Sequence, residues 1–202
     1  MAVSAYSEMR MRLRDAIRDT YSTQWDDTAL DVIIYEAVRE YSLFSGENIK
    51  RYNLYSNEEN MIFLPYLFFE PVKVISDGKE LPIVSWKKLQ KENGCRDFTK
   101  VIGNKAEAIC FNYHSFGIAC VYPKIPAGKK IGELVYRAIY ENGIMPENKE
   151  AVEAHCLYQL NLLTSKKSTG AYWQRFLDLV NKKARSVNTL RNKRNTRRGV
   201  YF

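Results

Sequence analysis

The sequence is poor in the residues and motifs that most often carry catalysis. It has only two histidines and four cysteines among 202 residues, and no two of its cysteines form a C-x-x-C pair. The glycine-rich motifs G-x-G-x-x-G and G-x-x-x-x-G-K-S/T, which hold phosphates, are absent, and so is the G-x-S-x-G nucleophile elbow. These absences argue against the nucleotide-binding enzymes and hydrolases that such motifs identify.

The histidines and cysteines that are present do not form a reactive pair in the sequence. Cys110 and His114 lie four residues apart in a predicted strand, where such side chains are far apart along one face. His155 and Cys156 are neighbours on a predicted helix and therefore point in different directions. We predict no catalytic residue, no metal site and no cofactor, and hence a protein that is not an enzyme.

Long apolar segments are also missing. No run approaches the ~18 to 20 apolar residues that span a bilayer, so no membrane is expected as a partner. The first residues lack the basic and apolar regions of a secretory signal. The chain is therefore expected to be made and assembled in a cytoplasm, where its four cysteines would remain thiols.

Acidic residues are absent from the last 21 residues, and this absence concentrates the net charge there. Residues 1–181 contain 23 basic and 23 acidic side chains, so they are neutral as a whole. The segment 182–202 carries the whole net charge of +8 and ends in the apolar residues Val200, Tyr201 and Phe202. Its basic side chains are Lys182, Lys183, Arg185, Arg191, Lys193, Arg194, Arg197 and Arg198. A neutral body with such an arm indicates attachment to nucleic acid or to a larger partner.

The first fifty residues predict two amphipathic helices. Apolar residues recur at helical spacing over about residues 4–20. Asp26 is a good N-cap for a second helix, with Trp25 in the position of a hydrophobic staple. Gly46 is typical of the residue that ends a helix. Each helix is too short to be stable alone, so both are expected to pack into a common body.

The middle of the chain predicts a small antiparallel β unit over about residues 60–126. The dipeptide Asp77-Gly78 stands between apolar runs, which is a hairpin signal. A second hairpin follows, with a turn around residues 114–117, and Pro123 and Pro126 close it. The predicted strands are 72–75 and 83–86 in the first hairpin, and 108–113 and 118–122 in the second.

Helical spacing then returns. The pattern of Ile131, Leu134, Val135, Ala138 and Ile139 predicts that the helical body resumes at about residue 130. Pro146 suits the first turn of the next helix, which runs through Leu157, Leu160 and Leu163. A last helix has the cleanest apolar stripe of the chain, namely Trp173, Phe176, Leu177, Val180, Ala184 and Val187.

These patterns predict an α+β fold in a single domain, residues 1–187, followed by an extended basic arm. The helical bundle would comprise residues 1–50, with the N-terminal helix pair, and residues 130–187. Residues 188–202 lose the apolar pattern and cannot bury enough surface to fold alone.

The order of these elements resembles the head–tail connector proteins, or adaptor ring proteins, of tailed double-stranded DNA phages, with the podovirus and crAss-like types nearest. The family pattern A-x-x-E-Y-S is matched by Ala37 to Ser42, and its Leu-Pro strand start by Leu64-Pro65. Its V-x-V-x-x-D-G-x-x-L pattern is matched by Val72 to Leu81, with a following Trp at Trp86, and its Y-x-x-x-P by Tyr122 to Pro126. Each motif alone is weak, and nothing in the family pattern matches residues 132–143.

The resemblance implies a structural subunit of the virion at the head–tail junction. Connector proteins of this family form homo-oligomeric rings, usually of twelve copies, that join the portal protein to the tail or to the next ring and surround the DNA channel. Their C-terminal arm docks on the portal. The arm residues expected to dock here, or to touch passing DNA, are Arg191, Lys193, Arg194, Arg197, Arg198, Val200, Tyr201 and Phe202.

A second hypothesis is a nucleic-acid-binding protein with a folded oligomerisation body and a basic arm. Such arms bind phosphates and release counterions. The apolar tip favours a protein groove instead, because an aromatic anchor supplies binding energy there while the charges steer docking. Tyr201 and Phe202 therefore distinguish the two hypotheses better than the arginines do.

Overall fold

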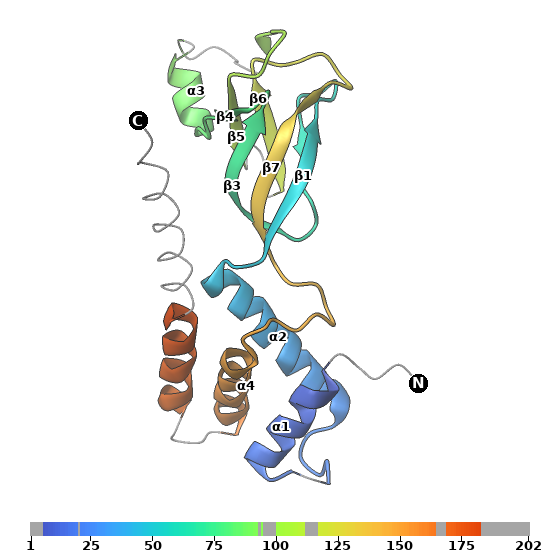
Figure 1. The fold of residues 1–202 in the computed structure, drawn as a ribbon, viewed down its shortest axis with the longest axis vertical. Helices are drawn as coiled ribbons and strands as arrows, with labels where there is room; N and C mark the ends of the chain where they lie inside the picture. The colour runs from blue at the N-terminus through green and yellow to red at the C-terminus, as the bar shows by residue number, and fades with distance from the viewer. Residues whose placement is uncertain are drawn as a thin grey trace, which may run out of the picture. The chain divides into compact units, whose positions relative to one another are not determined.

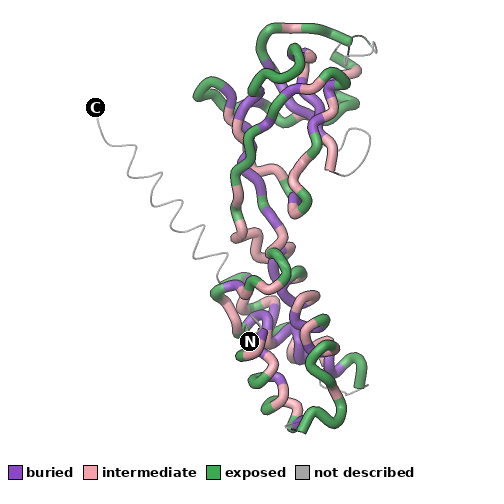
Figure 2. The backbone as a smooth tube through the Cα atoms, turned by 90° about the vertical axis from the view of Figure 1, so that its right-hand side faces the viewer, coloured by how far each residue is buried: buried purple, intermediate pink, exposed green. Residues whose placement is uncertain are grey.

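The computed structural model describes residues 6–19, 21–92, 94, 100–111, 117–164 and 169–182. The described chain has a mixed α+β fold with antiparallel sheets, as the sequence predicts (Figure 1). It divides into two compact units, and Figure 2 shows buried positions in both. The helical unit comprises residues 1–48 and 140–202, and the β unit comprises Ile49–Ile139. None of the described helices is long and apolar enough to cross a membrane.

The helical unit is built from both ends of the chain. Its labelled helices are α1 (Ser7–Ile17), α2 (Asp27–Ser45) and α4 (Lys149–Leu163), and residues 169–182 form a further helix. The predicted ends of α2 are confirmed, because the Asp26 side chain accepts a hydrogen bond from the Ala29 N–H at 2.7 Å and Gly46 has a φ of 58°. The core contains Leu13, Leu30, Ile34, Tyr41, Val152, Cys156 and Phe176, all fully buried.

The described part of the β unit contains two antiparallel sheets and one short helix. Sheet A has the order β1 (Ile49–Tyr55), β7 (Lys130–Ala138), β3 (Phe68–Ser76) and β4 (Lys79–Leu81). Sheet B has the order β2 (Ile62–Phe63), β6 (Ile118–Tyr122) and β5 (Ala108–Phe111). The short helix is α3 (Trp86–Glu92).

The two sheets share one apolar core, and α3 belongs to a second, smaller one. Sheet A contributes Leu54, Val74 and Leu134 to the shared core, and sheet B contributes Ile62, Ile109 and Val121. Leu89 of α3 packs instead with Ala108, Cys110 and Cys120 of sheet B. Successive strand residues point to opposite faces of a sheet, so Cys110 and Ile109 face opposite cores.

A hairpin forms at each predicted place, although the second strand of the first one is Lys79–Leu81 rather than residues 83–86. Asp77 and Gly78 have φ angles of 49° and 76°, which is the two-residue turn that matches the twist of a hairpin, and they join β3 to β4. The second hairpin pairs β5 with β6, and its turn residues 112–116 lie outside the described residues. The predicted strand 83–86 is wrong in part, since Ile83 makes only an isolated bridge to Ile109 and Trp86 begins α3.

The prediction of a helical body from residue 130 is wrong for residues 130–138, which form strand β7. This strand lies between β1 and β3 (Figure 1), and side chains on both of its faces are buried, among them Leu134, Val135 and Tyr136. A strand buried on both faces loses the alternation of apolar and polar residues. The apolar run of β7 therefore fitted a helical period by chance.

The predicted limits of the β insertion, about 60 to 126, are also too narrow. Strand β1 begins at Ile49, inside the segment 1–50 predicted to be helical, and β7 extends the unit to Ile139. In β1 only Leu54 is buried, because the strand forms the edge of sheet A. Its mainly polar sequence gives no alternating signal.

Candidate functional site

The arm residues predicted to dock, from Arg191 to Phe202, lie outside the described residues, so their interactions stay a prediction. The structure does describe the helix that leads into the arm. We call residues 169–182 the arm-bearing helix. Its buried side chains include Phe176 and Val180, as the apolar stripe predicts, whereas Ala184 and Val187 of that stripe fall beyond the described residues.

A cluster of aromatic rings attaches the arm-bearing helix to the rest of the helical unit. Trp173 and Phe176 meet Phe44 of α2 edge-on, at ring-centroid distances of 5.8 and 5.6 Å. On the α4 side, His155 lies 4.9 Å from Phe176, and Tyr158 lies 5.2 Å from Trp173. Offset and edge-on aromatic pairs each add about 0.5 to 1.5 kcal/mol beyond their burial. The helix of residues 169–182 is therefore firmly packed against α2 and α4.

His155 is a buried part of this cluster and has no arrangement for acid–base catalysis. Its side chain is 3% exposed, and Nδ1 has no hydrogen-bond partner among the described residues. Burial lowers the pKa of His155 to about 4, so the ring is neutral at physiological pH. It packs against rings, and no carboxylate in the described part of the chain orients it. The structure thus assigns it to the core.

The described cysteines are also structural. Cys110 and Cys120 stand opposite each other on β5 and β6, and both are buried. A hydrogen bond with Cys110, together with burial, raises the pKa of the Cys120 thiol, and burial raises that of Cys156. A thiol with a raised pKa is a poor nucleophile at neutral pH. The hydrogen bond with Cys120 lowers the pKa of Cys110, but this thiol is fully buried and out of reach of a substrate. Cys95 and His114 lie outside the described residues.

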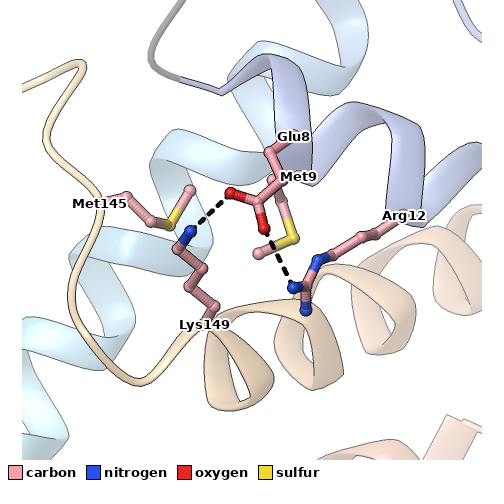
Figure 3. A pocket seen from close by; sticks show the side chains of 5 residues that line it. All are labelled: Glu8, Met9, Arg12, Met145 and Lys149. Carbon is pink, nitrogen blue, oxygen red and sulfur yellow. Dashed lines mark hydrogen bonds and ion pairs between the residues drawn. The ribbon is translucent and has the colours of Figure 1, made fainter.

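A small hollow lies between α1 and α4 (Figure 3). Glu8 bridges its rim, with its carboxylate 2.5 Å from Lys149 Nζ and 3.0 Å from the Arg12 guanidinium. The hydrogen bond from Lys149 is the main reason that the pKa of Glu8 lies below its usual value. The hollow has a volume of about 30 Å³, which is room for about one water molecule. The Glu8–Lys149 pair therefore joins α1 to α4, and the Glu8–Arg12 pair lies within α1, so neither is left to bind a substrate.

Ion pairs also connect α1 to the start of α2. Arg10 and Arg14, one helical turn apart, face Asp27 and Asp31, which are also one turn apart. Asp19 fixes the intervening loop, because its carboxylate accepts hydrogen bonds from the backbone N–H groups of Thr23, Gln24 and Trp25 at 2.8 to 3.1 Å. These contacts set the geometry of the helix pair. Among the described residues, no cluster of three or more histidines, cysteines or carboxylates could hold a metal ion.

The boundary between the units reveals a charge pattern that sequence reasoning missed. The β unit contains 14 Lys and Arg against 9 Asp and Glu, a net charge of 14 − 9 = +5. Residues 1–48 and 140–181 contain 9 basic and 14 acidic side chains, a net charge of −5. The neutral body is therefore the sum of a basic β unit and the part of the helical unit before residue 182, which is acidic. Part of this pattern could have been found from the sequence, because the predicted insertion, residues 60–126, already contains 9 basic and 6 acidic side chains, a net charge of 9 − 6 = +3.

Comparison with known proteins gives no further assignment. Neither the models of known protein families nor the curated proteins include a match to this chain.

Proposed function

We propose that this protein is a structural subunit of a phage head–tail connector ring. The observation that carries the proposal is the order of elements: two helices, an inserted β unit, then two helices that lead to a basic arm. This is the order expected from the resemblance to connector proteins. In this proposal the chain has a structural role and no catalytic site, in keeping with the neutral buried His155 and the buried thiols.

In this proposal the arm docks on the portal protein. The aromatic cluster around Trp173 and Phe176 fixes the helix from which the arm extends. A fixed base lowers the entropic cost of placing the arm on a partner. The basic residues of the arm would steer docking, and Tyr201 and Phe202 would anchor it in a groove. The ring itself would form by repeated head-to-tail contacts that close by rotation.

The decisive experiment mixes the full chain with the portal protein of the same phage. We expect a complex with a ring of about twelve copies, the usual number in this family, observed by native mass spectrometry and electron microscopy. A variant lacking residues 191–202 should keep its circular dichroism spectrum but fail to join the portal. Normal attachment of this truncated chain would refute docking by the arm, and absence of any ring would refute the connector proposal.

The second candidate is a nucleic-acid-binding protein, and the +8 charge of residues 182–202 favours it. It predicts binding to DNA with an affinity that falls by several powers of ten for each tenfold rise in salt, if most of the eight charges meet phosphates. The double variant Tyr201→Ala/Phe202→Ala separates the two candidates. It should abolish docking on the portal, whereas a phosphate-binding arm would tolerate it.

A further inference from the structure

A groove lies at the end of the β unit where β3 turns into β4 and β7 begins. Its volume is about 350 Å³, and its walls include Asp77, Gly78, Lys130, Gly132 and Glu133. We call it the tip groove. A bulge shapes it, because Leu54 pairs with Gly132 and Tyr55 with Lys130, which leaves Ile131 as an extra residue in β7. Bulges often occur where a strand must redirect a side chain near a functional site.

The acidic side chains of the tip groove are already neutralised. Asp77 lies 3.1 Å from the Lys105 ammonium group, and Glu133 lies 3.3 Å from the Arg51 guanidinium. A carboxylate with its own basic partner contributes little net negative potential at a distance. The sign of the electrostatic potential in the groove therefore depends on the remaining charged groups.

Those groups are three lysines at or next to the rim, Lys79, Lys129 and Lys130, and one carboxylate, Glu80, which stands opposite the groove-lining Ile75. None of the lysines has an acidic partner within ion-pair distance among the described residues. Lys130 lines the groove directly, and Lys79 follows Gly78 in the hairpin turn. These lysines outnumber Glu80, so the surroundings of the groove carry a net positive charge, and the groove belongs to the unit with a net charge of +5.

The backbone holds two of these lysines in place. Ser56 accepts a hydrogen bond from the Lys129 N–H through Oγ at 3.0 Å, and its own N–H donates to the Lys129 carbonyl at 2.9 Å. Lys130 is paired with Tyr55 in the sheet. Charges on a rigid backbone lose less entropy on binding than charges on a mobile loop.

We propose that the tip groove binds the phosphate backbone of duplex DNA. Lysine ammonium groups act as point charges and suit phosphate contact without sequence readout. The groups that recognise carboxylates best are arginine forks. The described arginines of the β unit, Arg51 and Arg137, are both engaged with glutamates of their own sheet. This disfavours an acidic protein as the partner.

The test uses the full-length chain with a neutral arm, in which Arg191, Lys193, Arg194, Arg197 and Arg198 are all changed to Gln. Binding of a fluorescent 20-base-pair DNA duplex is followed by anisotropy at low salt. In this background, Lys129→Glu/Lys130→Glu should weaken binding by roughly tenfold or more. The matched control is Lys87→Glu/Lys91→Glu on exposed positions of α3, which makes the same change in net charge but should cost less than about threefold.

Equal losses in the two double variants would show that only net charge matters and would overturn the proposal. The proposal would also be overturned if Lys129→Glu/Lys130→Glu bound the DNA duplex as well as its parent does. Polyglutamate that competes with DNA at equal charge concentration would identify an acidic protein segment as the partner instead. If the double variant does not fold, as judged by circular dichroism, Lys130→Gln supplies the same comparison against Lys91→Gln.

This inference does not rest on the connector proposal, because the free chain is tested without a portal. If the chain joins the portal normally but Lys129→Glu/Lys130→Glu loses no DNA binding, only the tip-groove proposal is refuted. A chain that binds DNA through the groove but never forms a ring would refute the connector proposal alone.

Discussion

Gly132 of β7 lies directly against the backbone of Ile75 in β3. A Cβ atom at position 132 would overlap the Ile75 carbonyl oxygen, which is backbone and cannot move aside as a side chain can. Glycine is therefore required here for the close approach of two strands rather than for its backbone angles.

We expect Gly132→Ala to destabilise the β unit by about 1 to 3 kcal/mol, the usual cost of overpacking. Urea unfolding followed by fluorescence measures this loss. The control is Gly170→Ala, because position 170 is helical and a Cβ there meets no atom within 4 Å. That variant should be neutral or slightly more stable, since alanine favours helix. Equal stability of the two variants would contradict the close contact.

The neutral state of His155 gives the helical unit a dependence on pH. Its pKa is about 4 in the fold against a usual value of 6.5. Between pH 6.5 and about pH 4 the His155 ring is protonated in the unfolded chain but neutral in the folded chain. The contribution to stability is therefore complete above pH 6.5 and falls as pH drops towards 4, by roughly 3 kcal/mol in total.

His155→Phe should remove this part of the pH dependence, because the ring surroundings accept a phenyl group and the unpartnered Nδ1 disappears. Melting temperatures of the parent and the variant, recorded from pH 4 to 8, provide the comparison. The curves should diverge as pH falls, with the variant more stable at the acid end. Parallel curves would show that His155 is already protonated or exposed to water in the fold.

The aromatic cluster should determine how firmly the arm-bearing helix is held. Phe176→Ala removes a fully buried ring and should cost about 3 to 5 kcal/mol. Amide hydrogen exchange should then rise most in residues 169–182. Arg175→Ala, at the exposed neighbouring position, should change stability by less than about 0.5 kcal/mol. Exchange that rises evenly over the whole chain would argue against a separately held helix.

Asp19 should stabilise the helix pair only while it is ionised. Burial opposes ionisation, but hydrogen bonds from Gln24, Thr23 and Trp25 outweigh it and lower the pKa of Asp19 below its usual 3.8. Its contribution is therefore present above that value and is lost as pH falls through the lowered pKa. Asp19→Asn should lower the melting temperature at neutral pH and approach the parent in acid. Asp15→Asn, at an exposed position of the preceding helix α1, should match the parent throughout.

Local signals predicted much of this fold, and they did so where a single short segment determines the structure. The Asp26 cap, the Gly46 helix end and the Asp77-Gly78 hairpin depend only on the conformations of a few neighbouring residues. Apolar stripes likewise located α1, α2, α4 and the arm-bearing helix. Such signals hold whatever the rest of the chain does.

Strands β1 and β7 could not be predicted in this way, because their identity depends on what packs against them. A central strand with two covered faces and an edge strand with one buried residue both lack alternation. The tip groove was missed for the same reason, since Gly78 and Lys130 are brought together only by the pairing of β3 with β7. The two lie far apart in the sequence.

The pairing of Ile49 with Arg137 means that the β unit begins and ends at neighbouring positions. In the chain that forms the helical unit, the whole insertion acts as a loop whose two ends are held together by this strand pairing. The entropic cost of joining α2 to the following segment is therefore that of a hairpin and does not grow with the length inserted. The β unit can thus be lengthened, shortened or exchanged for another sheet at little cost to the helices. In a protein built in this way, one unit can change while the other keeps its fold.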